Sequence, residues 1–250
     1  MGRLLILISI LITTVGFAQQ PQQKYNQTDA QGRKQGVWKK AYDNTQVFRY
    51  VGQFKNDIPV GEFTYYYESG EVQAKIVFSD NGKTTRSKMY HESGYLMALG
   101  KYVNEQKDSI WVYFDDKGRI SYQETYKNDK LNGQKVYFYA PKDGQYPVSR
   151  YEYYKDGVLD GEFKEFHQNM QIKAKGQYKD GNLHGAIVYY YSNGKIMKTC
   201  NYKYAVKHGP WAFYNESGQL VGTKMYWEGK LMEGKQVDEK MAIWKAQHSK

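Results

Sequence analysis

The chain has 250 residues, with 36 basic and 26 acidic side chains and a formal net charge of +10. Aromatic residues make up 16% of it and include 26 tyrosines, whereas the single cysteine, Cys200, cannot form an internal disulfide. No Gly-x-Ser-x-Gly elbow, phosphate-binding loop or paired Cys-x-x-Cys motif occurs. The commonest hydrolase, nucleotide-binding and zinc-binding signatures are therefore excluded.

Residues 1–18 have the pattern of a secretory signal peptide. Arg3 precedes an apolar run from Leu4 to Ile12, and the small residues Gly16 and Ala18 follow. This run is too short to cross a bilayer, and a buried N-terminal strand is the alternative interpretation. We therefore expect an exported protein, periplasmic or secreted, that is cleaved near Ala18 and has no transmembrane segment in its mature form.

Residues 19–31 are rich in glutamine and lack periodicity, which is typical of a flexible leader. A 24-residue unit then repeats over residues 32–234, and its clearest copy begins at Tyr178. Each copy opens with an aromatic anchor, and successive anchors are 24 residues apart except for one interval of 28. The anchors are Phe54, Phe78, Tyr102, Tyr126, Tyr154, Tyr178, Tyr202 and Tyr226. A fixed short period predicts a stacked, one-dimensional architecture and a single domain.

Each unit is predicted to form one β-hairpin. A glycine closes a three-residue loop in most copies, as in residues 68–70, and this suits a type I turn followed by a left-handed residue. Seven residues after each anchor lies glycine, threonine or serine, from which we expect a requirement for small size. The repeat therefore predicts an all-β fold, an elongated single-layer antiparallel meander of β-hairpins.

The loop also predicts which side chains share a face. Tyr66 should pair with Val72, and an insertion at residues 140–147 should move the equivalent partner of Phe138 to Val148. Along the second strand, the packed face is expected to continue through small residues such as Ala74, which join Tyr66. The opposite face, with the tryptophans, is expected to be solvated and to carry Lys75, Lys101, Lys173 and Lys175.

Residues 235–250 follow the last partial copy. Val237, Met241 and Trp244 fall at helical spacing. We expect a short helix that caps the last edge of the sheet, with a final irregular strand as the alternative.

The unit as a whole resembles the MORN repeat. It combines an aromatic anchor, an Asn/Asp-Gly pair, a small residue, Trp or Phe followed by Tyr, and a turn glycine, and its spacing is most similar to the variant repeats of the YwqK-like antitoxin family. The resemblance covers residues 32–234 and implies an elongated sheet used as a scaffold or binding surface. For some relatives it implies neutralisation of a toxin encoded nearby, and for eukaryotic MORN proteins contact with acidic phospholipid. A signal peptide departs from the antitoxin pattern, because export would remove the chain from the cytosol.

The histidines do not indicate a metal or catalytic site. His91 and His167 share one repeat slot, and His184 and His208 share another, so recurring surface geometry accounts for them. We expect no enzyme activity, no catalytic residue, no cofactor and no metal, and the alternative is an enzyme with its site in the insertion after Tyr139. Nucleic-acid binding is not expected, because the lysines are spread over every repeat.

The aromatic residues that the predicted packing does not use are candidates for binding. Exposed Tyr and Trp side chains supply much of the energy of protein interfaces. The predicted partner-binding surface consists of Tyr65, Trp111, Tyr113, Tyr137, Tyr189, Trp211, Phe213, Lys173 and Lys175. We expect a protein partner, with an antitoxin-like or immunity-like role as the more specific form. The alternative is attachment to an anionic envelope surface, phospholipid or glycan.

Overall fold

The computed structural model describes residues 24–248, so the predicted signal peptide lies outside the described residues. These residues form a 19-stranded sheet in which successive strands pair antiparallel, with β17 joining β15 beyond the short β16. The strands are β1 (Gln27–Thr28), β2 (Lys34–Ala41), β3 (Phe48–Lys55), β4 (Ile58–Tyr66), β5 (Val72–Ser79), β6 (Thr84–Tyr90), β7 (Leu96–Val103), β8 (Gln106–Phe114), β9 (Ile120–Lys127), β10 (Lys130–Phe138), β11 (Val148–Lys155), β12 (Val158–Phe166), β13 (Ile172–Lys179), β14 (Asn182–Tyr190), β15 (Ile196–Lys203), β16 (Val206–Lys207), β17 (Gly209–Tyr214), β18 (Leu220–Trp227) and β19 (Lys230–Leu231).

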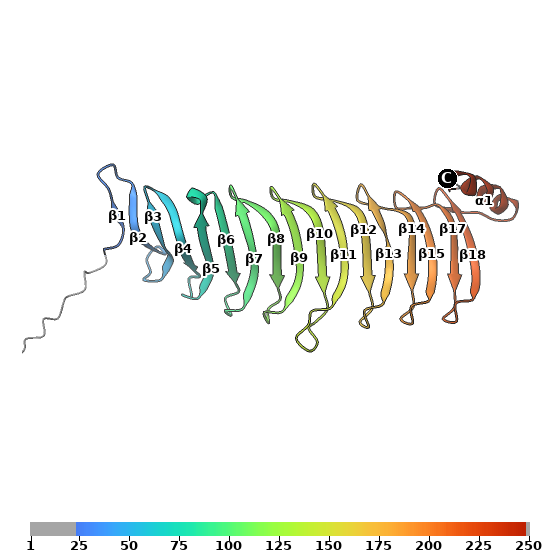
Figure 1. Ribbon diagram of the computed structural model, residues 1–250, viewed down its shortest axis with the longest axis horizontal. Helices are drawn as coiled ribbons and strands as arrows, with labels where there is room; N and C mark the ends of the chain where they lie inside the picture. Colours follow the sequence, from blue (N-terminus) through green and yellow to red (C-terminus); the bar gives the residue numbers. More distant parts are fainter. Residues whose placement is uncertain (1–23, 249–250) are drawn as a thin grey trace, which may run out of the picture.

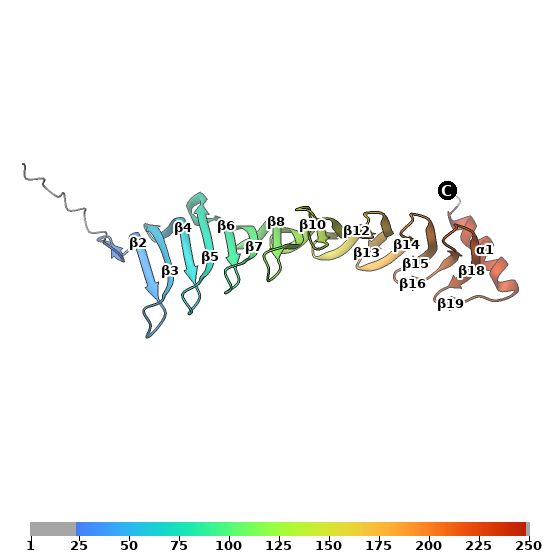
Figure 2. The ribbon, with the colours of Figure 1, turned by 90° about the horizontal axis from the view of Figure 1, so that it is seen from below.

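The strands lie side by side in chain order along a single-layer ribbon (Figure 1). Their inclination changes along the ribbon, as expected for a twisted sheet (Figure 2). The helix α1 (Lys235–His248) lies at the C-terminal end. The predicted all-β meander and the predicted C-terminal helix are confirmed. Within residues 24–248, no helix has the length and apolar character needed to span a membrane.

Two-residue turns connect most repeats. In the turn at Asn56 and Asp57 both residues have positive φ, 53° and 67°, as a type I′ turn requires. Asn, Asp and Gly tolerate this region, which explains the Asn/Asp-Gly pairs of the repeat. The turns also bind one another, because the Gly181 N–H donates to the carbonyl of Leu159 one repeat earlier, at 2.8 Å.

A bulge follows each of these turns and explains the residue seven positions after the anchor. Gly61 has a φ of 68°, yet a Cβ built there would meet nothing within 4 Å. The slot therefore requires a left-handed backbone. The expected requirement for small size does not hold at Gly61 but holds in other copies, where a Cβ on Gly133 would lie 3.0 Å from Thr125 and one on Gly209 would overlap Trp244. Ser109 keeps this conformation, with a φ of 62°. Thr85 does not need it, because β5 and β6 pair without a register shift and a longer connection that contains η1 (Asp80–Gly82) replaces the turn.

A second bulge lies beside each hairpin loop. Tyr66 pairs with Val72, as predicted, but Tyr65 pairs with Ala74, so Gln73 is skipped. Skipping one residue transfers the rest of the second strand to the other face. Ala74 therefore lies with Tyr65 and not with Tyr66, and the predicted assignment of the faces is wrong beyond the bulge. The same shift recurs in the other hairpins.

The hairpin ends are joined by side-chain hydrogen bonds between successive repeats. The Tyr67 hydroxyl donates to the Tyr90 carbonyl at 2.8 Å. His167 occupies the equivalent slot, and its Nε2 lies 3.0 Å from the Tyr190 carbonyl oxygen. His167 therefore has a structural role, whereas the Nε2 of His91, in the same repeat slot, is buried without a hydrogen-bond partner among residues 24–248.

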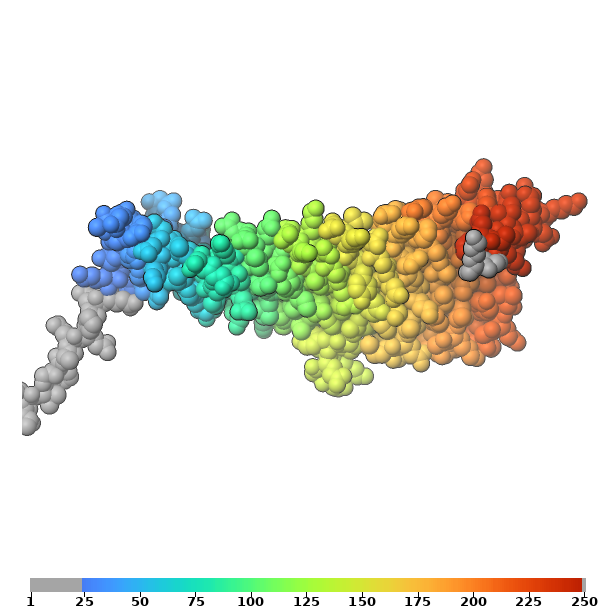
Figure 3. Space-filling view, turned by 45° about the horizontal axis from the view of Figure 1, so that its top comes forward, coloured from blue at the N-terminus to red at the C-terminus, as the bar shows by residue number. Residues whose placement is uncertain are grey.

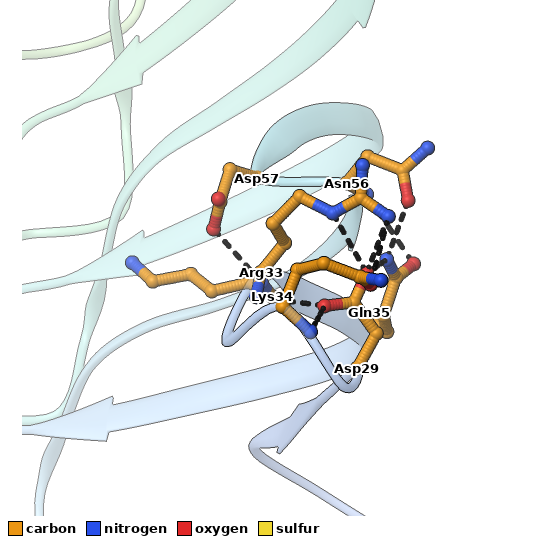
Figure 4. Close-up of polar contacts among 7 residues, drawn as sticks. Asp29, Arg33, Lys34, Gln35, Asn56 and Asp57 are labelled. Carbon is orange, nitrogen blue, oxygen red and sulfur yellow. Dashed lines mark hydrogen bonds and ion pairs between the residues drawn. The ribbon is translucent and has the colours of Figure 1, made fainter.

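The N-terminal end of the ribbon is bonded more tightly than predicted. Residues 19–31 were expected to be a flexible leader, but Gln27–Thr28 form β1, which pairs with β2. Asp29 then accepts hydrogen bonds from the side chains of Arg33 and Gln35, and the Asp57 carboxylate accepts one from the Lys34 N–H (Figure 4). The leader predicted for residues 19–31 is therefore too long.

The insertion lies between β10 and β11. It protrudes from the ribbon (Figure 3), and an isolated bridge joins Lys142 to Gln145. Phe138 pairs with Val148, as predicted. The repeat thus accommodates the extra residues as a loop and resumes its register.

Candidate functional site

One face of the sheet carries the anchor rings, and we call it the aromatic face. Nine residues after the anchor, a large side chain on this face covers a small residue of the preceding strand. Phe63 covers Gly52 and Trp111 covers Gly100, and a Cβ on either glycine would overlap the ring. Trp111 is 1% exposed and Trp211 is 8% exposed. The expectation that these two tryptophans lie on a solvated face is therefore wrong.

Lysine side chains contact the same tryptophans. The Nζ atom of Lys107 lies 4.7 Å from the centre of the Trp111 ring, and that of Lys207 lies 5.0 Å from the centre of the Trp211 ring. Each lysine precedes its tryptophan by four residues, so the contact belongs to the repeat. Buried and covered in this way, the tryptophans are part of the core and cannot anchor a partner.

The structure divides the remaining residues of the predicted surface between the two faces. Lys175 pairs with Val188, and its Nζ lies 5.7 Å from the Tyr190 ring on the face opposite the aromatic one. Lys173 lies 3.8 Å from Glu165. Half-buried on the aromatic face are Tyr65, Tyr113, Tyr137, Tyr189 and Phe213. These rings do not form one surface with Lys175, and their role in binding stays a prediction.

The middle of the aromatic face is charged, and we call Glu124, Lys135, Arg150, Glu152 and Glu165 the charged centre. Lys135, in the slot of Trp111, forms an ion pair with Glu124 at 2.8 Å. Arg150 forms ion pairs with Glu152, at 2.7 Å, and with Glu165. Burial lowers the pKa of Lys135, but its hydrogen bonds, first to Glu124, outweigh burial and raise it. Each of the three carboxylates thus has a cationic partner, and Glu152 and Glu165 share Arg150.

The opposite face contains a groove over β4 to β8, which we call the basic groove. It encloses about 930 Å³. Val77 and Ile110 form apolar parts of its lining and are 44% and 54% exposed. The charged side chains that line it are Glu62, Lys75, Arg86, Lys88 and Lys101. The groove therefore combines exposed aliphatic surface with an excess of positive charge.

Like charges face each other directly within the basic groove. Lys75 is opposite Lys88 between β5 and β6, and Arg86 is opposite Lys101 between β6 and β7. Such pairs destabilise an antiparallel sheet. Within residues 24–248, Lys101 forms an ion pair with Asp108 at 3.0 Å, whereas Lys75, Arg86 and Lys88 form none. Three cations that form no ion pair with a described residue are thus held together, although Glu62 lines the same groove, and their like-charge pairing lowers the stability of the sheet.

Part of this groove could have been found from the sequence. Lys75 and Lys101 were singled out, but the skipped residue in each hairpin placed them on the wrong face. Arg86 and Lys88 belong to the copy in which Thr85 replaces the bulge glycine, and that departure from the pattern was a usable signal. The four cations come together through cross-strand pairing, and this pairing can be known only from the register that the structure shows.

The described residues give little support for a metal site or a reactive nucleophile. Between residues 24 and 248, no group of three or more His, Cys, Asp or Glu side chains could hold a metal ion. Cys200 is 0% exposed, and burial raises the pKa of its thiol. It fills the small slot that Gly100 and Gly176 occupy in other repeats, as a packed side chain would.

Comparison with known families identifies the same repeat. Four segments of the chain match the family model described as MORN repeat variant. The matched residues are 59–81, 159–180, 183–204 and 207–228, together less than half of the chain. The unmatched stretch between residues 81 and 159 contains most of the charged centre and part of the basic groove. These MORN repeat matches support a repeat scaffold, and they do not distinguish the YwqK-like antitoxin family.

Individual proteins add little to the MORN repeat match. No curated protein matches the chain. Among solved structures, the chain is similar to the pneumococcal O-GlcNAc transferase GtfA in complex with UDP and GlcNAc, with 13% identity and a TM-score of 0.16 over 50% of this chain and 19% of that chain. A GtfA/B complex bound to UDP and GlcNAc has 15% identity and a TM-score of 0.17 over 58% and 25%. The chain thus spans at most about a quarter of those chains, and at these scores the likeness carries no argument.

Proposed function

We propose that the chain is an exported, non-enzymatic repeat scaffold whose basic groove binds an acidic segment of a protein partner. The observation that carries the proposal is the juxtaposition of Lys75 with Lys88 and of Arg86 with Lys101. Carboxylates placed over these pairs would relieve the repulsion within the sheet, so binding gains from contacts that the free protein lacks.

The shape of the groove favours a polypeptide over a flat surface. Val77 and Ile110 are exposed in the same groove as the cations, where aliphatic side chains of a partner could be buried. A segment that mixes acidic and aliphatic residues matches both features of the lining, because buried apolar area supplies affinity and charge complementarity supplies specificity. An immunity-like role, with a toxin as the partner, is a more specific form of this proposal and rests on the resemblance alone.

Attachment to an anionic envelope surface is the second candidate function. It is favoured by the net charge of +10, which is distributed along the whole chain. Attachment through distributed lysines should weaken steeply with ionic strength, whereas a segment held partly by apolar contacts should persist. The response to salt therefore separates the two functions.

The matched variants Lys75→Glu and Lys175→Glu test the groove. Both lysines lie three residues before an anchor and on the same face, but only Lys75 lines the groove. With the mature protein and a fluorescent peptide of alternating Glu and Leu, Lys75→Glu should weaken binding by about tenfold, while Lys175→Glu leaves it nearly unchanged. Lys75→Glu should also raise stability by about 0.5 kcal/mol, because an opposite-charge pair replaces a like-charge pair.

Equal losses in both variants would contradict the groove as the binding site. The same proteins are then tested with vesicles of phosphatidylglycerol and phosphatidylcholine. Binding to these vesicles, lost at high salt and insensitive to which lysine is changed, would favour surface attachment instead. Export is tested separately by mass spectrometry of the protein from its native envelope fraction, where the chain should begin at Gln19.

A further inference from the structure

On the aromatic face, rings bridge successive anchors. The Phe63 ring centre lies 5.1 Å from that of Phe54 and 5.0 Å from that of Phe78. Trp211 bridges two later anchors in the same way, at 5.4 and 5.0 Å. These separations lie in the range that aromatic pairs prefer. A ring nine residues after the anchor is thus a regular member of this face.

The repeat anchored by Phe78 lacks its bridging ring. Ser87 occupies that slot, 2% exposed, with a hydroxyl that has no hydrogen-bond partner. Phe78 contacts the ring of Phe63 on one side, and Tyr102 contacts the ring of Trp111 at 4.8 Å on the other. Within residues 24–248, no ring joins Phe78 to Tyr102.

A groove of about 780 Å³ lies between these two anchors, and we call it the ring-slot groove. Ile76 and Met89 line it together with Phe78 and Tyr102. The connection containing η1 replaces both the two-residue turn and the bulge in this repeat, and its residues Asn81 and Gly82 line the groove. The groove therefore coincides with the irregular connection of this repeat.

We propose that the ring-slot groove binds an aromatic side chain of a polypeptide partner, which bridges Phe78 and Tyr102 as Phe63 bridges Phe54 and Phe78. The groove lies between two anchor rings that no third ring of the described chain bridges, and Ile76 and Met89 give it an apolar lining, so both features favour an aromatic ligand. Asn81 and Glu105 on the rim offer hydrogen-bonding groups to the backbone on either side of that ring, which a free ring could not use. The site lies on the face opposite the basic groove and does not depend on it.

Methionine methyl resonances locate the binding. The full mature chain is labelled at its methionine methyls and titrated with a short Gly/Ser peptide that contains one tryptophan, and with a matched peptide that has alanine instead. The Met89 signal should shift with the tryptophan peptide, because the methyl would lie beside the bound ring, while Met225, 1% exposed in β18, should not move. The tryptophan peptide should bind at least about tenfold more tightly than the alanine peptide.

The double variant Ile76→Gly/Ser87→Phe tests the slot itself. It rebuilds the pair that Gly52 and Phe63 form in the preceding repeat, and it should abolish the preference for tryptophan with an unchanged circular dichroism spectrum. If it does not fold, Met89→Trp fills the groove from its lining, and the same loss is expected.

Several results would overturn the assignment. They are an unmoved Met89 signal, a preference for tryptophan that survives in a folded groove-filling variant, or free indole binding as tightly as the peptide. The last result would make the site one for small aromatic molecules. Lys75→Glu should leave the preference for tryptophan unchanged, so this proposal and the proposed function can fail independently.

Discussion

The aromatic face is filled in two different ways along the ribbon. Towards the C-terminus it is an apolar cluster of buried residues, Phe163, Ala174, Ile187, Cys200 and Trp211. The charged centre, which extends from Glu124 in β9 to Glu165 in the same strand as Phe163, fills its slots with paired acids and bases, of which Glu124 and Glu152 are only 7% and 4% exposed. The bulges and the antiparallel pairing follow the same pattern in both regions, although the charged centre contains the insertion between β10 and β11. The hairpin frame is therefore set by backbone geometry, and it accepts any filling of the slots that satisfies packing and charge.

The slots are filled as pairs across two strands. Gly176 lies under Ile187, so a small residue is matched to a large one. Glu124 is matched to Lys135 by charge, at 2.8 Å. One pair, Ile76 and Ser87, has the order of sizes reversed, and Ile76 lines the ring-slot groove. Facing residues on adjacent strands thus vary together from repeat to repeat. Substituting one or both members of such a pair therefore tests the comparison between the two regions.

The largest expected effect is in the apolar cluster. Trp211→Ala should lower the free energy of unfolding of the C-terminal repeats by about 3 to 5 kcal/mol, because it leaves a cavity in a packed core. Urea denaturation followed by intrinsic fluorescence measures this loss. Val221→Ala, at a side chain that is 64% exposed in the adjacent β18, should change stability by less than about 0.5 kcal/mol. Similar losses in both variants would show that burial on this face does not determine stability.

Removing one side chain of an ion pair in the charged centre should lower the free energy of unfolding by nearly as much. Lys135→Ala should destabilise by about 3 kcal/mol, because Glu124 would remain buried without its cation. Glu124→Gly/Lys135→Trp, which copies Gly100 and Trp111, should be neutral or stabilising, since a packed apolar pair often equals or exceeds a buried ion pair. Thermal denaturation of both variants decides the point. A double variant as unstable as the single one would mean that the network stabilises the repeat in a way its pairs do not.

Substituting either of two glycines should lower the stability of the protein, for different reasons. Gly176→Ala should cost about 1 to 3 kcal/mol through overlap with the Ile187 side chain, and Ile187→Val should recover part of that loss. Gly61→Ala should cost about 1 kcal/mol, because its φ of 68° disfavours a Cβ although the space around it is open. Gly61→Asn should cost less than Gly61→Ala, since Asn tolerates the left-handed region. If Asn and Ala cost the same in unfolding experiments, the backbone conformation is not the cause.

The sequence predicted the hairpin frame because the frame depends on residues that recur. The anchors, the turn glycines and the pairing of Tyr66 with Val72 are repeated in most copies, and these features of the prediction are confirmed. The assignment of faces failed at Gln73, the residue skipped by the bulge, because nothing about its side chain marks a one-residue irregularity. A single such error exchanges the faces of a whole strand, which placed Trp111 and Lys75 on the wrong sides.

The candidate sites were less predictable than the frame. The basic groove depends on which residue of β5 faces which residue of β6, and the ring-slot groove depends on a ring that is missing. Thr85 and Ser87 departed from the repeat visibly in the sequence, but only the structure relates that departure to an open space between two anchors. In a repeat protein, sequence periodicity predicts the parts that copies share, whereas binding sites arise where copies differ.

The smallest expected effect is on the pKa of the anchor tyrosines, which again differ between the two regions. Burial and then the hydrogen bond to Glu152 raise the pKa of Tyr154 to about 12, whereas burial is the main cause of the raised pKa of Tyr202 in the apolar cluster. Glu152→Gln keeps the shape of the side chain and removes its charge. The pKa of Tyr154 should therefore fall below about 12, while that of Tyr202 stays unchanged. Titration of ring-labelled tyrosine by nuclear magnetic resonance measures both values.

The same substitution should change stability in alkali in a defined direction. A phenol whose folded pKa is raised above the ordinary value of about 10 stabilises the fold fully below pH 10, and this contribution is lost as the pH rises towards about 12. Removing the charge of Glu152 should reduce the loss over that interval, by less than about 1 kcal/mol because the ring is partly exposed. Tyr126, whose pKa of about 12 is due to burial and then to Glu124, serves as the internal control. If Tyr126 shifts as much as Tyr154, the charged centre responds as one coupled unit and not as separate pairs.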